Sequence, residues 1–194
     1  MIDIRTVSSQ DLPSIAGMHM RLFEGDYSTS LGYDFVKNYY YGILLDGRLG
    51  FGLMAYEGDS PAGFIFGAYD HEKIKRLKLL PQAMRTFLCL ITRPRQNYPW
   101  LKLFFKAKRS FVSPFKAELV SLCVKNEFQG RGIGRLLIRA FKDRLRSMQI
   151  RGCWTKTYSP EAARLYESEG FLEKQGFDFI GRSYRFYVWE NKNG

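Results

Sequence analysis

The chain has few of the residues that build metal sites or disulfides. It contains two histidines, His19 and His71, and three cysteines, Cys89, Cys123 and Cys153. The cysteines form no CxxC pair, and both histidines lie far from them in sequence. We therefore expect neither a zinc site nor a disulfide framework, and the simplest location is a reducing compartment, the cytoplasm.

Long apolar runs are also missing, since no stretch reaches the roughly 18 consecutive apolar residues of a membrane-spanning helix. The chain is nevertheless 45% hydrophobic and 16% aromatic, which argues against a disordered protein. A length of 194 residues is enough for a compact domain with a buried core. Because no linker or internal repeat is visible, we expect one domain over residues 1–194.

Acidic residues are nearly absent from one segment. Residues 71–116 contain twelve Lys and Arg side chains but a single acidic one, Glu72. The rest of the chain is balanced in charge, so this segment, which we call the basic segment, accounts for the whole net charge of +11. Its apolar residues recur at roughly helical spacing, which predicts a helical insertion.

Outside the basic segment, predicted strands and helices follow one another along the chain. The predicted strands are "IDIRTV", the two halves of "FGLMAYEGDSPAGFIFGAYD", "AELVSLCV", "GCWTKTY" and "FDFIGRSYRFYVWE". The predicted helices are "SSQDLPSIAGMHMRLF", "YDFVKNYYYGILLDG", "GIGRLLIRAFKDRLRSM" and "SPEAARLYESEGF". This interleaving indicates one α/β domain.

The most unusual stretch is "QGRGIG", Gln129–Gly134, which follows a predicted strand and opens a predicted helix. A helix N-terminus has unpaired N–H groups and a partial positive charge. Glycines at that point let a phosphate approach the backbone closely, so the pattern favours a phosphate or pyrophosphate ligand. The alternative is a tight loop whose glycines serve packing alone. The spacing fits neither the P-loop nor the dinucleotide-binding fingerprint.

The stretch does resemble the Q/R-x-x-G-x-G/A signature of the GNAT superfamily of acetyl-CoA-dependent N-acetyltransferases. The resemblance extends from Glu118 to Phe171. "AELVSLCV" is similar to the fourth strand of the family, which splays from the fifth, and "SPEAARLYESEGF" resembles its N-x-x-A-x-x-L-Y-E-x-x-G-F segment. The resemblance implies an α/β (α+β) GNAT-like fold with a mixed, mostly antiparallel sheet flanked by helices. In this fold the basic segment joins strands three and four.

The resemblance also implies acetyl-CoA as the cosubstrate, with no metal. The loop residues that it assigns to the cofactor are Gln129, Gly130, Arg131, Gly132, Ile133, Gly134 and Arg135. Backbone N–H groups of this loop would hold the pyrophosphate. Val124 would offer main-chain groups to the pantetheine or the acetyl carbonyl. Ser159 stands where the family has Asn. It can still cap the helix that follows it, but it reaches less far toward coenzyme A.

For catalysis, the resemblance implies direct acetyl transfer to a primary amine, without an acyl-enzyme. Tyr166 matches the tyrosine that protonates the sulfur of coenzyme A, and the alternative is a buried aromatic residue. Glu118 lies six residues before Val124, where the histone-acetyltransferase branch has its catalytic Glu, and it is the candidate base. The alternative is an ordinary glutamate at a strand end. We expect Cys123 to be a core residue, since no base is near it in sequence.

Several alternatives stay open at this stage. The basic segment could form a lid with an apolar lining (Trp100, Phe104, Phe105 and Phe111), lie on an anionic membrane, bind a polyanion, or present solvated helices. The chain could bind acyl-CoA or a polyanion without turnover, or use a longer acyl group. Trp154 occupies the register of a Glu that ribosomal-protein acetyltransferases often have, which makes that substrate class less expected. The aromatic C-terminal strand could serve a homodimer.

Overall fold

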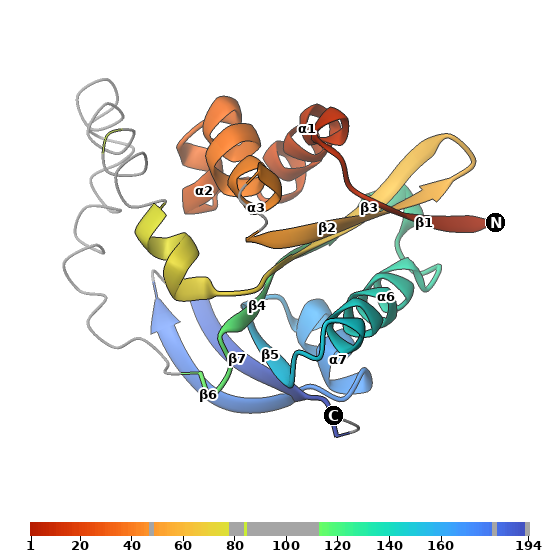
Figure 1. Cartoon of the computed structure of the whole chain (residues 1–194). Helices are drawn as coiled ribbons and strands as arrows, with labels where there is room; N and C mark the ends of the chain where they lie inside the picture. The colour runs from red at the N-terminus through yellow and green to blue at the C-terminus, as the bar shows by residue number, and fades with distance from the viewer. Residues whose placement is uncertain (47–48, 78–83, 85–112, 180–181, 193–194) are drawn as a thin grey trace.

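The computed structural model describes residues 1–46, 49–77, 84, 113–179 and 182–192 (Figure 1). Its strands are β1 (Ile2–Thr6), β2 (Gly50–Glu57), β3 (Ser60–Ala68), β4 (Ala117–Val124), β5 (Gly152–Thr157), β6 (Leu172–Phe179) and β7 (Arg182–Glu190). Its helices include α1 (Leu12–Leu22), α2 (Tyr27–Ser30), η2 (Phe35–Gly42), α3 (Ile43–Asp46), α6 (Ile133–Ser147) and α7 (Pro160–Ser168), with short 3-10 turns η1 (Ser9–Asp11) and η3 (Asn126–Phe128).

The seven strands form one sheet in the order β1-β2-β3-β4-β5-β7-β6. All neighbours are antiparallel except β4 and β5, which are parallel, so the predicted mixed and mostly antiparallel sheet is confirmed. Figure 1 shows α1, α2 and α3 on one face and α6 and α7 on the other. We call these the α1 face and the α6 face. One hydrophobic cluster fills each side of the β1–β4 half.

The second predicted helix differs in kind from the expectation. Residues Phe35–Gly42 form a π-helix, η2, which continues into α3. The wider turn orients Tyr41 toward β3, where its ring packs against Phe64 and Phe66. π-helical turns are rare and frequently mark functional sites.

The prediction of one C-terminal strand over "FDFIGRSYRFYVWE" is wrong. The segment contributes to two antiparallel strands, β6 and β7, and β7 lies between β5 and β6. Aromatic residues of the two strands stack on each other, as Phe177 does on Tyr184 with ring centroids 5.3 Å apart. Because β6 forms the edge of the sheet, β7 has neighbours on both sides. The proposed homodimer through this strand stays a prediction.

The basic segment joins β3 to β4, as expected from the sequence. Residues 71–77 are helical, and Ile74 is buried in the core of the α1 face. The backbone N–H of His71 donates to the carbonyl of Lys116 over 2.9 Å, so the two ends of the segment meet. Trp100, Phe104, Phe105 and Phe111 lie outside the described residues. No helix in the described parts of the chain is long and apolar enough to cross a membrane.

Candidate active site

The strands β4 and β5 separate in the middle of the sheet. They are paired only through Ala117 and Glu118 of β4. One residue further along, the side-chain hydroxyl of Thr155 donates to the carbonyl of Leu119 over 2.9 Å, in place of a backbone hydrogen bond. The divergence of the fourth and fifth strands that the resemblance implies is therefore present. It opens the sheet beyond Leu119.

A β-bulge lies at the same place on the other edge of β4. Gly67 pairs with Leu119 and Phe66 pairs with Ser121, so Val120 has no partner on β3. Bulges re-aim side chains and are common next to active sites. Here, Leu119 packs in the cluster of the α6 face, whereas Val120 packs in the cluster of the α1 face.

The glycine loop leaves the mouth of α6 open. Gly130 and Gly132 have φ angles of 76° and 77°, in the left-handed region that favours glycine. A Cβ atom at either position would meet nothing within 4 Å. A Cβ at Gly134 would lie 2.9 Å from Cδ2 of Leu165, so this glycine lets α6 pack closely on α7. The packing interpretation therefore applies to Gly134 alone, and the other two glycines shape an open helix N-terminus.

Two further loop residues have defined positions. Nε2 of Gln129 donates to the carbonyl of Val124 over 3.0 Å, which ties the start of the loop to the end of β4. The side chain of Ile133 is buried in the core of the α6 face. Only the backbone of Ile133 is therefore available to a ligand, and Gln129 shares the Val124 carbonyl with any group that binds there.

The two loop arginines form ion pairs with the protein. Nη1 of Arg131 lies 3.0 Å from Oε2 of Glu57 at the end of β2, and Nε of Arg135 lies 3.2 Å from Oε1 of Glu169. Both arginine side chains are about half exposed. Both arginine side chains are thus already paired with a carboxylate, so the backbone N–H groups at the start of α6 are the candidate anion-binding groups of the loop.

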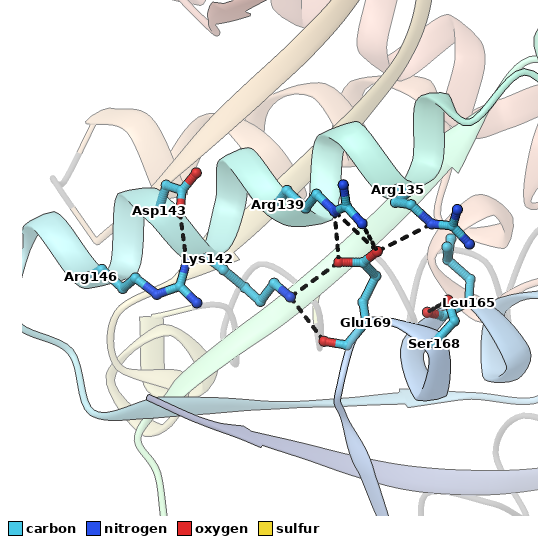
Figure 2. A network of polar contacts seen from close by, with 8 residues as sticks. All are labelled: Arg135, Arg139, Lys142, Asp143, Arg146, Leu165, Ser168 and Glu169. Atoms are coloured by element: carbon cyan, nitrogen blue, oxygen red, sulfur yellow. Dashed lines mark hydrogen bonds and ion pairs between the residues drawn. The ribbon is translucent and has the colours of Figure 1, made fainter. Parts of the chain in front are cut away.

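Glu169 is the centre of an ionic cluster that joins α6 to α7 (Figure 2). Its nearly buried carboxylate contacts Arg135, Arg139 and Lys142, and Nζ of Lys142 also donates to the Glu169 carbonyl over 2.9 Å. Burial alone would raise the pKa of Glu169, but the hydrogen bonds from Arg139 and Lys142 outweigh it and hold that pKa below its usual value. Because Tyr166 is on α7, the cluster fixes this side chain relative to the glycine loop.

Ser159 is the N-cap of α7. Its hydroxyl oxygen accepts a hydrogen bond from the backbone N–H of Ala162 over 3.1 Å and donates to Glu161 over 2.9 Å. The predicted capping role is confirmed. A contact with the cofactor stays a prediction.

Tyr166 lies on the α6 face at the point where the strands separate. The residue is 4% exposed and packs beside Phe171 and Tyr187. Burial raises the pKa of Tyr166 to about 12, and a hydrogen bond with Thr155 opposes part of this shift. Since Thr155 also bonds Leu119 of β4, the phenol lies next to the divergence. It stays protonated over the ordinary pH range and is suited to donate a proton.

Glu118 is the last residue of β4 that pairs with β5, and its side chain is on the opposite face. Its Oε2 lies 2.5 Å from Nδ1 of His71, and the His71 ring meets Trp154 edge-on with centroids 4.9 Å apart. The sequence interpretation missed His71. It follows the end of β3, and Glu118 opens β4, so the order of the two strands was the available signal. Antiparallel neighbours bring these ends together, with Ala68 opposite Glu118.

A second carboxylate, that of Asp26, also lies on the α1 face. Asp26, at the start of α2, accepts a hydrogen bond from the hydroxyl of Tyr158 over 3.0 Å and pairs with Arg182 of β7 over 2.5 Å. Burial, followed by the charges of Glu118 and Asp26, raises the pKa of Tyr40. Both carboxylates therefore act on one region, which joins η2, β4 and the loop before α2.

Behind this region lies a buried chain of hydrogen bonds. Nδ1 of His19 is 2.7 Å from the hydroxyl of Tyr41, and its Nε2 is 3.0 Å from the hydroxyl of Ser28. Ser121 donates to the hydroxyl of Tyr41 over 3.0 Å. Burial lowers the pKa of His19 to about 4, so the ring is neutral near pH 7. This chain of hydrogen bonds connects α1, α2 and η2 to the bulge of β4.

The described residues offer few other reactive groups. Cys123 is buried in the core of the α1 face and burial raises the pKa of its thiol, which confirms the core assignment. Within the described ranges, no three or more His, Cys, Asp and Glu side chains are grouped as metal ligands would be.

This combination of a diverging β4 and β5 and an open glycine loop before α6 agrees with comparisons to known proteins. Residues 102–173 match the sequence model of the acetyltransferase (GNAT) domain. Over these residues the chain is similar to GNAT acetyltransferases. No curated protein sequence matches it.

Solved structures share the GNAT fold over nearly the whole chain. One is yncA from Salmonella typhimurium with its cofactor acetyl-CoA, at 17% identity, covering 100% of this chain and 95% of the other with a TM-score of 0.63. A ribosomal-protein-alanine N-acetyltransferase from Brucella melitensis is 17% identical, with coverage of 97% and 99% and a TM-score of 0.62. The spermidine/spermine N-acetyltransferase SpeG from Vibrio cholerae is 14% identical, with coverage of 98% and 95% and a TM-score of 0.57. At these identities the likeness shows the fold.

Proposed function

We propose that this protein transfers the acetyl group of acetyl-CoA directly to a primary amine. The observation that carries the proposal is the position of Tyr166 and Glu118, which lie on opposite faces of the sheet at the point where β4 and β5 separate. A proton donor and a carboxylate are thus available on the two sides of one opening. The structural similarity to yncA with acetyl-CoA supports the choice of cofactor.

Acetyl-CoA would bind along the opening and the glycine loop. The backbone N–H groups from Arg131 to Arg135 would hold the pyrophosphate, because the first turn of a helix has no internal partners for these groups. The open space around Gly130 and Gly132 fits this role. The main chain of Val124 would contact the pantetheine arm. Gln129 and Ser159 would border the cofactor through the loop and the α7 cap.

The thiolate that leaves coenzyme A needs a proton, and Tyr166 is placed to supply it. Its raised pKa of about 12 keeps the phenol protonated until the sulfur develops negative charge. The acceptor amine must lose a proton before it can attack, because an alkyl ammonium has no lone pair. Glu118 provides the negative charge that this deprotonation requires on the α1 face.

The acceptor is expected to approach from the α1 face. Burial raises the pKa of Tyr40, and the charges of Glu118 and Asp26 raise it further; a cationic amine is attracted to a region near two carboxylates. Asp26 is already paired with Arg182, so the pair of Glu118 and His71 is the polar group left for the acceptor. The similar structures include enzymes named for a ribosomal protein and for spermidine and spermine. The fold therefore accommodates acceptors of both kinds.

The proposal is tested by release of the coenzyme A thiol from acetyl-CoA with a panel of primary amines. We expect release only when an amine is present, with kcat lowered about 100-fold in Tyr166→Phe because a general acid contributes about 10²–10⁴-fold. Tyr56→Phe is the matched control, since its hydroxyl bonds Asp11 of η1. Tight binding of acetyl-CoA without release with any amine would instead indicate a binding module. Release of the coenzyme A thiol only from an acyl-CoA with a longer chain would change the proposed acyl donor.

A further inference from the structure

We propose that Nε2 of His71 takes the proton from the acceptor ammonium, and that Glu118 acts on the reaction by positioning this imidazole. The inference rests on the proposed acetyl transfer and names the atom that acts as the general base in it. His71 lies outside the family pattern that points to Glu118. The pairing of β3 and β4 alone brings His71 next to this carboxylate.

The hydrogen bond to Glu118 decides which nitrogen of His71 is free. A carboxylate only accepts hydrogen bonds, so the Nδ1 atom that lies 2.5 Å from Oε2 of Glu118 must have the proton. In the neutral ring, Nε2 then has the lone pair. Among the described residues, none forms a hydrogen bond with Nε2. Its lone pair is therefore available to an incoming ammonium group.

Exposure distinguishes the two candidates for the base. The side chain of His71 is 30% exposed, whereas that of Glu118 is 12% exposed. The carboxylate is the more buried of the two groups, and the oxygen nearest to the ring already accepts a hydrogen bond from it. An arriving amine reaches the ring more readily than the carboxylate. Imidazole is also the side chain used most often as a general base.

His71 is held in place by three neighbours. Its backbone N–H bonds the carbonyl of Lys116, its ring meets Trp154 edge-on, and Nδ1 is bonded to Glu118. Asp70 accepts a hydrogen bond from the backbone N–H of Lys73 and so fixes the first turn of the helix at residues 71–77. The imidazole is thereby oriented by groups outside the reacting atoms, which is the arrangement that general bases require.

The proposed steps balance in atoms and charge. Nε2 of His71 takes one proton from the ammonium, and the freed nitrogen lone pair forms a bond to the thioester carbonyl carbon. The carbon–sulfur bond then breaks, and the sulfur takes the phenolic proton of Tyr166. The nitrogen loses its second excess proton through water, which restores the phenol. The imidazolium gives its proton to solvent, so one proton is released for each amide formed.

The test uses chemical rescue in the full-length protein. We expect His71→Ala to lower kcat/KM for the amine at least about 100-fold, with unchanged acetyl-CoA affinity, and added imidazole to restore part of the rate. Glu118→Ala should also lower the rate, but imidazole should not restore it, because His71 remains present without its orienting partner. Lys75→Ala is the control on the same helix, since its side chain is 59% exposed. Thermal unfolding of each variant, with His71→Gln as a second substitution, separates chemistry from folding.

The possible results separate two failures. Full activity of His71→Ala, or rescue of Glu118→Ala by imidazole, would overturn the inference and leave acetyl transfer intact. A wild type that releases no coenzyme A with any amine would overturn the proposed function and the inference with it. NMR adds a readout that needs no turnover, because the chain has only two histidines. His71 should show a protonated Nδ1 and an unprotonated Nε2, and an Nε2–H tautomer would contradict the assignment.

Discussion

The two histidines of this protein occupy environments of opposite character. Both ring nitrogens of His19 have partners, Tyr41 and Ser28, and the residue is 2% exposed. Among the described residues, the ring of His71 has one hydrogen-bond partner, Glu118, and about a third of its side chain is exposed. His19 is surrounded by neutral groups, whereas a carboxylate lies beside His71. The same residue type is thus part of the scaffold in one place and is available to a ligand in the other.

The comparison shows what a histidine needs for chemistry. A ring with both nitrogens bonded in a buried site cannot exchange protons with a substrate, however close it lies. A ring oriented on one side by a carboxylate and open on the other can do so. Variants of the two histidines and of their neighbours test this difference, from the largest expected effect to the smallest.

Exchanging each histidine for glutamine should separate activity from structure. We expect His71→Gln to lower kcat at least about 100-fold, because an amide is not a base, with a melting temperature within a few degrees of the wild type. In His19→Gln, kcat at low temperature should stay within about threefold, since the ring does not touch the reacting groups. Steady-state rates and thermal unfolding of the two variants measure this. Equal losses of kcat would remove the distinction.

The pH dependence of stability should depend on His19. Its pKa is about 4 in the folded protein and 6.5 when unperturbed, so both states are neutral above pH 6.5. Below that value the His19 imidazole binds a proton in the unfolded chain but not in the folded protein. The free energy of unfolding should therefore fall by about 3 kcal/mol between pH 6.5 and 4 through this residue.

Urea unfolding of the wild type and His19→Gln over this pH range checks the sign and size of the effect. The variant should lack this part of the slope, although carboxylates titrate in both proteins. An identical slope in the two proteins would show that His19 is protonated in the folded state. His71→Gln is the matched control, because the scaffold is expected to be unchanged in it.

The smallest expected effect concerns the far end of the buried chain. Ser121→Ala removes the hydrogen bond to Tyr41, and Tyr41 keeps His19 as its other partner. We expect a loss of about 1 kcal/mol in the free energy of unfolding, the usual net value of such a bond. Ser147→Ala, at an exposed position at the end of α6, should change it by less than about half as much. A loss above about 3 kcal/mol in Ser121→Ala would mean that the whole buried chain of hydrogen bonds is disrupted.

The parts of this site that were predictable from sequence are local. The open loop before α6 and the cap of α7 depend on residues within a few positions of each other, such as Gly132 and Ser159. The pair of His71 and Glu118 is 47 residues apart in sequence and meets only because β3 and β4 are antiparallel neighbours. Pattern and spacing identify a strand or a helix, but they do not show which strand ends meet.

Two other features were missed for related reasons. The arginines of α6 resemble solvated charges in the sequence, and nothing near them indicates that Glu169 of another helix is their common partner. The C-terminal aromatic segment has strand character throughout, so the alternation of its residues does not show where the chain turns back. Both features are set by packing between distant elements, which a single sequence records only weakly.

The most direct test of the central claim is calorimetric titration of acetyl-CoA into the wild type, Gly132→Asp and Gly32→Asp. Both glycines have positive φ angles and open space around the position of a Cβ, so the two variants share the same strain and added charge. Gly32 precedes η2, on the α1 face of the sheet. We predict binding by the wild type and Gly32→Asp, with at least about 100-fold weaker binding by Gly132→Asp. Equal binding by all three proteins, or none by the folded wild type, would contradict a cofactor site at the mouth of α6.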